Sequence, residues 1–166
     1  MSYRNLSSID WINWQPVEQG TLMYIFNENS VLLIRKKRGL GAGKINGPGG
    51  RIENGETPVD CAVRETREEV GVCPVKPFQV GRMCYQCTDG YSMDVSIFRS
   101  ESYWGDLRSS DEAEPFWTDV SKIPYGEMWP TDRNWLPLVI NRQSFTVYTL
   151  YDEDTVLGCK IKIGIQ

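Results

Sequence analysis

Apolar, β-rich runs recur along the chain, and two of them near its C-terminal end, residues 145–151 and 155–163, alternate with the two-residue period of a half-buried β-strand. Short polar segments at residues 27–30, 88–91 and 152–154 each join two such runs, as the turn of a β-hairpin does. The pattern predicts strands over residues 21–26, 31–36, 75–80, 83–87, 93–100, 145–151 and 155–163, and a further strand that includes residues 116–118.

One segment between these strands follows the helical period instead. Thr57 is a favourable N-cap, Pro58 suits the first helical position, and Gly71 is a favourable residue to end the helix. The apolar face of the predicted helix consists of Val59, Ala62, Val63, Thr66 and Val70.

A second helix is predicted near the C-terminal end of the chain. Thr131 or Asp132 caps it, and it runs through Trp135 to Asn141 despite Pro137. The order of strands, helix, strands and helix indicates an α/β protein, an α/β/α sandwich on a mixed sheet. We expect one domain over residues 21–166, with residues 1–20 as an extension whose Trp11 and Trp14 pack on the domain or on a partner.

The polar face of the first helix is acidic. Glu65, Glu68 and Glu69 share that face, and Glu56 precedes the helix. Like charges at this spacing repel each other by about 0.2–0.5 kcal/mol per pair. Two interpretations remain: a solvated face neutralised by arginines such as Arg64, or a site for a hard, oxygen-preferring cation such as Mg²⁺.

Composition and charge narrow the function classes. A net charge of -4 and a pI near 5.0 argue against broad nucleic-acid binding, so we expect no stable nucleic-acid complex. We expect neither a membrane span nor a signal peptide, because the sequence lacks a long apolar run and a basic-then-apolar leader. Five cysteines without a secretion signal imply reduced thiols and a cytoplasmic location.

The chain contains no histidine, which restricts its chemistry. Catalytic triads built on histidine are excluded. A general base must be a carboxylate, a lysine, a tyrosine or a water activated by a metal ion. A zinc site is not expected, because the pair Cys84 and Cys87 lacks a second pair of ligands.

The spacing of the acidic helix decides between its two interpretations. Gly50 is followed after five residues by Glu56, and after seven more by the run Arg64-Glu65-Thr66-Arg67-Glu68-Glu69-Val70-Gly71-Val72. This run resembles the signature of the Nudix family, G-x5-E-x7-R-E-U-x-E-E-x-G-U, at every fixed position. The one departure is Thr66, where the family prefers a bulky aliphatic residue. Thr66 lies on the apolar face, so the departure concerns packing rather than the carboxylates.

The resemblance extends over about three quarters of the chain, from residue 21 to about residue 145. It is to the oxidised purine nucleoside triphosphatase branch of the MutT/Nudix family, through residues 36–39, 41–43, 46–47, 49–50, 55–57, 93–95, 110–112 and 128–130, and Asp132. The resemblance implies a Nudix α/β/α sandwich with a mixed β-sheet. It also implies hydrolysis of a modified purine nucleoside triphosphate, such as 8-oxo-dGTP, to the monophosphate and pyrophosphate in nucleotide-pool sanitation.

The same resemblance implies Mg²⁺ as the cofactor, with Mn²⁺ as a substitute. The implied metal ligands are Gly49, Gly50, Glu56, Glu65, Glu68, Glu69 and Glu112. The implied catalytic residues are Glu65, Glu68, Arg64 and Glu112, with Arg64 orienting Glu68 or Glu69. Which of Glu65, Glu68 and Glu112 accepts the proton stays open at this stage.

For the purine base the resemblance implies Asn46, Trp129 and Asp132, within a pocket that also includes Thr21, Lys36, Leu40, Tyr85, Met93 and Thr131. Thr131 is a departure, because this branch has a second aspartate there. Two adjacent carboxylates can share a proton and so meet bases of different hydrogen-bond pattern, which a threonine cannot do. Leu40 also replaces an aromatic residue, and Ala113 a methionine. We therefore expect an oxidised guanine triphosphate to remain a substrate and oxidised adenines to be tolerated less.

Three alternatives stay open from the sequence. The same signature serves enzymes that cut a dinucleoside polyphosphate, an RNA 5′ end or a nucleotide sugar. A binding module without hydrolysis would not need all four carboxylates of the signature, and none is missing here. A structural role in an assembly has only the aromatic extension in its favour. The choice between monomer and dimer stays undecided.

Overall fold

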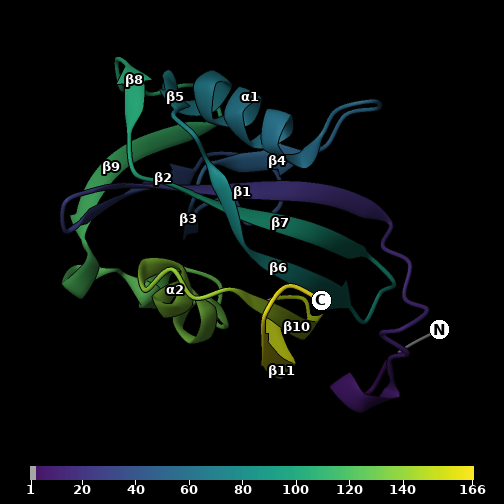
Figure 1. The fold of residues 1–166 in the computed structure, drawn as a ribbon. Coiled ribbons are helices and arrows are strands. Elements are labelled where there is room, and N and C mark those ends of the chain that lie inside the picture. Colours follow the sequence, from purple (N-terminus) through teal and green to yellow (C-terminus); the bar gives the residue numbers. More distant parts are fainter. Residues whose placement is uncertain (1–2) are drawn as a thin grey trace.

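A mixed β-sheet organises the chain, which is described for residues 3–166 by a computed structural model (Figure 1). Within this described part the sheet has nine strands, with the order β11-β10-β6-β7-β1-β2-β3, while β4 pairs with β1 and β9 pairs with β2. Its strands are β1 (Glu18–Asn27), β2 (Ser30–Lys36), β3 (Ile45–Asn46), β4 (Gly49–Arg51), β6 (Phe78–Cys87), β7 (Ser92–Ser100), β9 (Ala113–Asp119), β10 (Phe145–Asp152) and β11 (Thr155–Ile163).

The sheet is mixed because β1 runs parallel to β7 and β10 runs parallel to β6, while its other pairs are antiparallel. Helix α1 (Pro58–Val70) covers one face of the sheet and α2 (Asp132–Ile140) covers the other (Figure 1). A small separate sheet pairs β5 (Val72–Pro74) with β8 (Tyr103–Gly105). This architecture confirms the predicted α/β/α sandwich on a mixed sheet.

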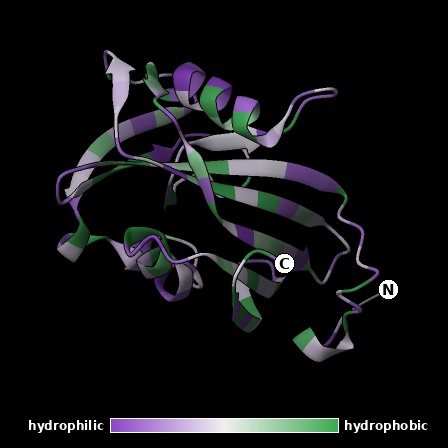
Figure 2. Ribbon diagram, in the orientation of Figure 1, coloured by the Kyte–Doolittle hydropathy of each residue, from purple (hydrophilic) through white to green (hydrophobic). Residues whose placement is uncertain are grey.

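Two apolar cores lie on opposite faces of the sheet, and β1 contributes to both. Successive residues of a strand point to opposite faces, so Leu22 and Tyr24 pack in the core that holds Trp135 of α2. Met23 and Ile25 pack in the core that holds Ala62 and Val70 of α1. Figure 2 shows α1 as alternating apolar and polar bands, as expected for a helix with one buried face.

Helix α1 begins and ends where the sequence predicts. Thr57 accepts a hydrogen bond from the Asp60 backbone N–H at 3.2 Å, Pro58 opens the helix, and Gly71 ends it with a left-handed φ of 84°. Burial of the helix extends further than the predicted apolar face, because Cys61 and Glu69 are also buried.

The hairpins β1–β2, β6–β7 and β10–β11 form at the predicted turns. Residues 75–80 and 83–87 were predicted as two strands, which is wrong: β6 is one strand, whose register shifts between Gln79 and Gly81. The four short strands β3, β4, β5 and β8 have only two or three residues each, too few to show a period. Strand β4 nevertheless matters for the site, because it pairs Gly50 with Thr21.

The segment before β1 packs on the domain. The Trp11 ring lies 4.9 Å from the ring of Tyr148 on β10, and Trp14 Nε1 donates to Gln86 Oε1 on β6 at 2.8 Å. A short 3-10 helix spans Leu6–Ser8, and β1 already begins at Glu18. Over residues 3–166, no helix has both the length and the apolar character that crossing a membrane requires.

Candidate active site

Three carboxylates meet beside α1. Glu65 and Glu69 lie one helical turn apart on α1, and Glu112 comes from the loop that precedes β9. One carboxylate oxygen from each of the three lies within 4.8 Å of the others. We call Glu65, Glu69 and Glu112 the carboxylate cluster.

Two glycines allow the backbone to approach this cluster. A Cβ atom at Gly50 would collide with the carboxylate of Glu65, and a Cβ atom at Gly49 would collide with the backbone carbonyl of Thr21. Glycine is therefore required at position 49 for β4 to lie against β1, whereas a side chain at position 50 would displace the Glu65 carboxylate. This places the Gly49–Arg51 backbone directly beside the carboxylate cluster.

The electrostatics of the cluster favour a bound cation. Glu69 is 4 % exposed, and its Oε2 atom has no hydrogen-bond partner among residues 3–166. Burial raises the pKa of Glu69 to about 8, and the charge of Glu65 contributes to the increase. Burial also raises the pKa of Glu65. Several carboxylate oxygens held together with an unpartnered buried oxygen are the donor set that a hard divalent cation prefers, so the residues present fit such an ion.

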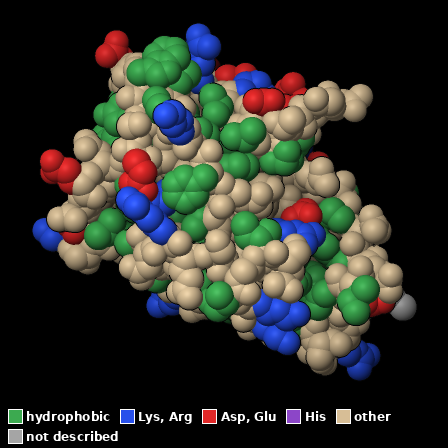
Figure 3. All heavy atoms as spheres, viewed as in Figure 1, with side chains coloured by type: hydrophobic (Ala, Val, Ile, Leu, Met, Phe, Trp, Pro, Cys, Tyr) green, Lys and Arg blue, Asp and Glu red, His purple; other side chains and the backbone are tan. Residues whose placement is uncertain are grey.

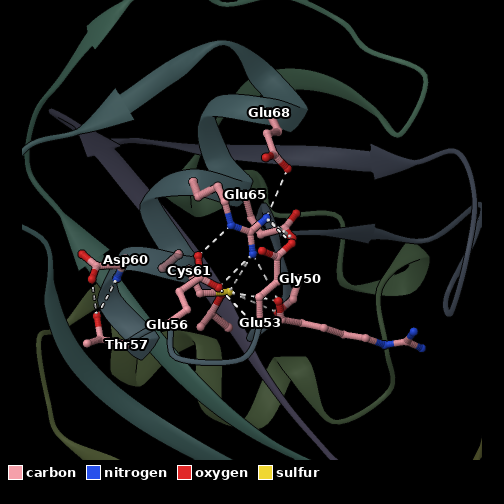
Figure 4. A network of polar contacts seen from close by, with 12 residues as sticks. Gly50, Glu53, Glu56, Thr57, Asp60, Cys61, Glu65 and Glu68 are labelled. Atoms are coloured by element: carbon pink, nitrogen blue, oxygen red, sulfur yellow. Dashed lines mark hydrogen bonds and ion pairs between the residues drawn. The ribbon is translucent and has the colours of Figure 1, made fainter.

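Arg64 forms hydrogen bonds with Glu56, Glu65 and Glu68, whose side chains are labelled in Figure 4. It binds Glu56 through two hydrogen bonds, Nε to Oε1 at 2.7 Å and Nη2 to Oε2 at 3.0 Å. Arg64 Nη1 also donates to Glu65 Oε1 at 2.9 Å and to Glu68 Oε2 at 3.2 Å. The hydrogen bonds from Arg64 lower the pKa of Glu56 to about 2, so Glu56 stays ionised.

The structure therefore divides the predicted acidic residues into two groups. Glu65, Glu69 and Glu112 form the cluster, in which Glu65 also pairs with Arg64 and Glu112 with Arg38. Glu56 and Glu68 pair with Arg64 and lie outside the cluster. Acidic and basic side chains lie next to one another along the upper edge of the molecule, over α1 (Figure 3). The salt-bridged interpretation thus describes the outer side of the helix, whereas on the side that faces the cavity Glu69 has no such partner among the described residues and the cation interpretation applies.

A cavity of about 490 Å³ extends from the carboxylate cluster across the sheet toward α2. Its lining includes Gly49, Gly50 and all three residues of the cluster. It also includes each residue predicted for substrate binding, namely Thr21, Lys36, Leu40, Asn46, Tyr85, Met93, Trp129, Thr131 and Asp132. Residues that are far apart in the sequence thus meet around one cavity of the size typical for small-molecule sites.

The end of the cavity near α2 presents a small set of polar groups. Asn46 Oδ1 accepts from the Tyr24 hydroxyl at 3.0 Å and from the Gly47 backbone N–H at 2.8 Å, which leaves its Nδ2 group to donate to a ligand. Asp132 is 2 % exposed, and its Oδ2 atom has no partner among residues 3–166. Burial raises the pKa of Asp132 to about 8, so the carboxyl group serves as a donor or an acceptor near neutral pH.

Aromatic rings form the wall beside these polar groups. The ring of Trp129 lies 6.0 Å from that of Tyr85, and Lys44 Nζ lies 5.0 Å from the centre of the Trp129 ring. A Cβ atom at Gly41, whose φ is 77°, would come within 3.1 Å of Trp129 Nε1. The glycine-rich loop and Lys44 therefore hold Trp129 in place at the cavity.

Sequence reasoning missed several residues that line the cavity, among them Tyr91, Tyr151 and Arg51. Tyr151 lies on β10, where all residues from Phe145 to Tyr151 are buried, so no alternation distinguishes the side that faces the cavity. Tyr91 and Arg51 both contact Glu18, Tyr91 through its hydroxyl at 2.7 Å and Arg51 through Nε at 2.9 Å. No signal in the sequence indicates that Tyr91, Arg51 and Glu18 lie together.

Known proteins are similar to this chain in sequence and in fold. Residues 17–139 match the NUDIX domain family. The chain is 38 % identical over 138 residues to an oxidized purine nucleoside triphosphate hydrolase of Danio rerio, covering 82 % of this chain and 88 % of the relative. It is 35 % identical over 144 residues to the protein of the same name in Mus musculus, covering 86 % and 92 %.

A solved structure supports the fold independently. A MutT protein from Bacillus halodurans superposes with a TM-score of 0.80 at 21 % identity, covering 88 % of this chain and 98 % of that protein. The family match covers the acidic helix, the glycine-rich loop and α2, which together line the cavity. On the strength of this match and of two relatives above 30 % identity, the chain belongs to the Nudix family.

Proposed function

We propose that this chain hydrolyses an oxidised purine nucleoside triphosphate, such as 8-oxo-dGTP, to the nucleoside monophosphate and pyrophosphate. The observation that carries the proposal is the single cavity, which joins the carboxylate cluster at one end to Asn46, Trp129 and Asp132 at the other. The names of the relatives from Danio rerio and Mus musculus agree with this substrate class. The activity would keep oxidised nucleotides out of the pool from which nucleic acids are made.

The end near α2 suits a purine base. Trp129 offers an aromatic face, which contributes about 1–3 kcal/mol when it stacks on a base. Asn46 Nδ2 donates to an acceptor on the base, and the Asp132 carboxyl group pairs with N–H groups on its edge. Lys36 lines the cavity and its charge acts on Glu69, so it is placed to approach the phosphate groups.

The carboxylate cluster is the proposed site of Mg²⁺, with Mn²⁺ as a substitute. When bound, the ion neutralises phosphate oxygens and lowers the pKa of a water molecule. Glu65, Glu69 and Glu112 would hold the ion, and the backbone of Gly49 and Gly50 lies beside these carboxylates. Glu68 lies outside the lining of the cavity and pairs with Arg64, which favours Glu65 or Glu112 over Glu68 as the proton acceptor.

Arg64 acts through the residues that it binds. Its hydrogen bonds to Glu56 and Glu65 fix the direction of the Glu65 carboxylate, so Arg64 is a positioning residue in this proposal. Glu56 and Glu68 anchor the guanidinium group from two further sides. No histidine is needed, because carboxylates supply both the ligands and the proton acceptor.

Pyrophosphate release with Mg²⁺ over a panel of nucleotides tests the proposal. We expect 8-oxo-dGTP to be hydrolysed with a higher kcat/KM than dGTP or 2-hydroxy-dATP, and no activity in the presence of EDTA. Product analysis should give the monophosphate and pyrophosphate. Selective cleavage of a dinucleoside polyphosphate, a nucleotide sugar or an RNA 5′ end would contradict the proposed substrate, and binding of nucleotides without turnover would contradict the proposed catalysis.

A further inference from the structure

Tyr151 lies at the centre of the aromatic wall of the cavity. Its ring centroid is 5.4 Å from that of Trp129 and 5.3 Å from that of Tyr85. Its hydroxyl oxygen lies 2.8 Å from Thr131 Oγ1 and accepts a hydrogen bond from the Thr131 backbone N–H at 3.2 Å. Both residues line the cavity, so the two hydroxyl groups form a hydrogen-bonded pair next to Asp132.

The hydroxyl pair has one hydrogen more than the contact between its two oxygens uses. Two hydroxyl groups carry two hydrogens, and one of them lies between the two oxygens. Neither hydroxyl has another side-chain partner within residues 3–166. Whichever of Thr131 and Tyr151 donates to the other, one O–H group therefore remains free to donate into the cavity. Burial raises the pKa of Tyr151 to about 12, so the pair stays neutral at physiological pH.

The free donor distinguishes between two classes of purine. A 6-oxopurine presents a carbonyl acceptor beside an N1–H donor, whereas a 6-aminopurine presents an amino donor beside an N1 acceptor. The hydroxyl pair and the carboxyl group of Asp132, the residue that follows Thr131, both line the end of the cavity near α2. The free hydroxyl hydrogen complements the first pattern, because it donates to the carbonyl oxygen of a 6-oxo group and meets a second donor at a 6-amino group. The Asp132 carboxyl group can donate or accept, so it pairs with N1 in either class of purine.

We propose that Tyr151 is a specificity-determining residue, which together with Thr131 presents one hydroxyl donor that selects purines with a 6-oxo group over purines with a 6-amino group. The proposal deepens the proposed function and rests on it. Thr131 alone would not give this result, because an unpaired hydroxyl rotates and accepts from an amino group as readily as it donates to a carbonyl. The contact with the Tyr151 hydroxyl and the hydrogen bond from the backbone N–H hold the two oxygen atoms in place, and either hydroxyl can be the one that donates within the pair.

The test compares kcat/KM for 8-oxo-dGTP with that for 8-oxo-dATP in variants of the pair. In Tyr151→Phe we expect the value for 8-oxo-dGTP to fall about 3-fold to 10-fold, the range for one hydrogen bond, while the value for 8-oxo-dATP changes less than about 2-fold. The double variant Tyr151→Phe, Thr131→Val removes both hydroxyls, so its preference should fall further. Thr131→Ser retains a hydroxyl at the same position and should keep the preference of the wild type.

Tyr148→Phe is the matched control, because Tyr148 lies on the same strand and packs against Trp11 instead of lining the cavity. The ratio of the two kcat/KM values is the readout, since a general loss of folded protein lowers both values equally. A ratio within about 2-fold of wild type in both Tyr151→Phe and the double variant overturns the proposal.

Failure of the proposed function gives a different result. If the wild-type protein hydrolyses neither nucleotide, the proposed catalysis is wrong, and calorimetric binding of 8-oxo-dGMP and 8-oxo-dAMP then tests Tyr151 directly. A preference for 8-oxo-dGMP that Tyr151→Phe reduces supports the role of the hydroxyl pair. Equal binding of the two monophosphates by the wild type overturns it.

Discussion

Glu69 differs from the other glutamates of α1 in its surroundings. It is buried, its Oε2 atom is unpartnered in the described chain, and burial together with Glu65 raises its pKa to about 8. An unpaired carboxyl group at such a site costs stability unless a cation or a proton compensates. Glu69 thus supports the proposed metal site, although its buried carboxyl group lowers the stability of the fold when no cation is bound.

The variant Glu69→Gln separates the contribution of Glu69 to catalysis from its effect on stability. We expect it to lose at least 100-fold in kcat, because the carboxylate cluster loses a charged ligand. In EDTA its melting temperature should equal or exceed that of the wild type, because a neutral amide replaces a buried acid in contact with Glu65. Circular dichroism melts and pyrophosphate release measure the two effects on the same samples.

Mg²⁺ provides the control for this pair of measurements. A ligand that binds only the folded state stabilises it by an amount that grows with the ratio of its concentration to its dissociation constant, so Mg²⁺ should raise the melting temperature of the wild type and have little effect on Glu69→Gln. Glu53→Gln is a matched substitution of an exposed glutamate outside the cavity and should behave like the wild type. Full activity in Glu69→Gln would remove this residue from the proposed metal site.

At the scale of elements, the segment before β1 is connected to the wall of the cavity. Trp14 Nε1 donates to Gln86 Oε1, and Gln86 Nε2 donates to the backbone carbonyls of Cys87 and Tyr91 at 2.9 and 3.1 Å. Gln86 therefore links the N-terminal segment to the β6–β7 turn, which carries Tyr91 into the lining of the cavity.

We expect Trp14→Phe to raise KM about 2-fold to 5-fold and to leave kcat within about 2-fold, because the turn that positions Tyr91 loses a support while the carboxylate cluster is untouched. Losing one hydrogen bond costs about 1 kcal/mol, which lowers the melting temperature of a chain of this size by about 2–4 °C. Steady-state kinetics with 8-oxo-dGTP and thermal melts check both effects.

Trp11→Phe serves as the comparison, because Trp11 packs on Tyr148 and has no hydrogen bond to Gln86. It should lower the melting temperature without changing KM. An unchanged KM in Trp14→Phe would show that the segment contributes to stability alone.

Local signals in the sequence predict elements well where they are strong. The cap at Thr57, the stop at Gly71 and the polar hairpin turns specify α1 and three hairpins through contacts between near neighbours. Strand β4 gives no such signal, because it has three residues, two of them glycine, and exists only through its pairing with β1. The predicted break in β6 lies at residues 81–82, next to the register shift between Gln79 and Gly81, where the paired strand continues without interruption.

In the candidate site, too, the sequence predicts contacts between near neighbours and does not predict contacts between residues that are far apart in the chain. Spacing along one helix is sufficient to bring Glu65 and Glu69 together, but it also groups them with Glu68, which the fold turns toward Arg64. The hydroxyl pair joins Thr131 to a residue 20 positions further along the chain, on a strand that is buried on both faces. Such a contact depends on how α2 meets β10, which no periodic pattern in one segment encodes.

At the scale of the whole molecule, the mixed sheet assembles the cavity from both of its faces. The carboxylate cluster belongs to the α1 side, whereas Asp132 belongs to the first turn of α2 on the other side. The cavity therefore contains two widely separated acids, Glu69 and Asp132, each with a pKa raised to about 8 by burial. Both acids make the global stability of the folded protein depend on pH.

Asp132→Asn isolates the contribution of Asp132 to that dependence. The pKa of Asp132 is about 8 in the folded protein, whereas the ordinary value of 3.8 applies to the unfolded protein. Between these two pH values the folded state therefore binds more protons than the unfolded state. The free energy of unfolding of the wild type should therefore fall as the pH rises from about 4 to about 8, by up to about 1.4 kcal/mol for each pH unit. Above pH 8 the acid is ionised in both states, and this contribution becomes constant.

Urea unfolding of both proteins from pH 5 to pH 9 measures the difference. The stability of Asp132→Asn relative to the wild type should increase with pH and level off above pH 8, whereas the contribution of Glu69 is common to both proteins and cancels. Asp111→Asn is the matched control, since Asp111 is exposed and should give a difference that does not vary with pH. A pH-independent difference for Asp132→Asn as well would mean that Asp132 is ionised throughout this range, and its carboxylate would then act only as an acceptor toward the base.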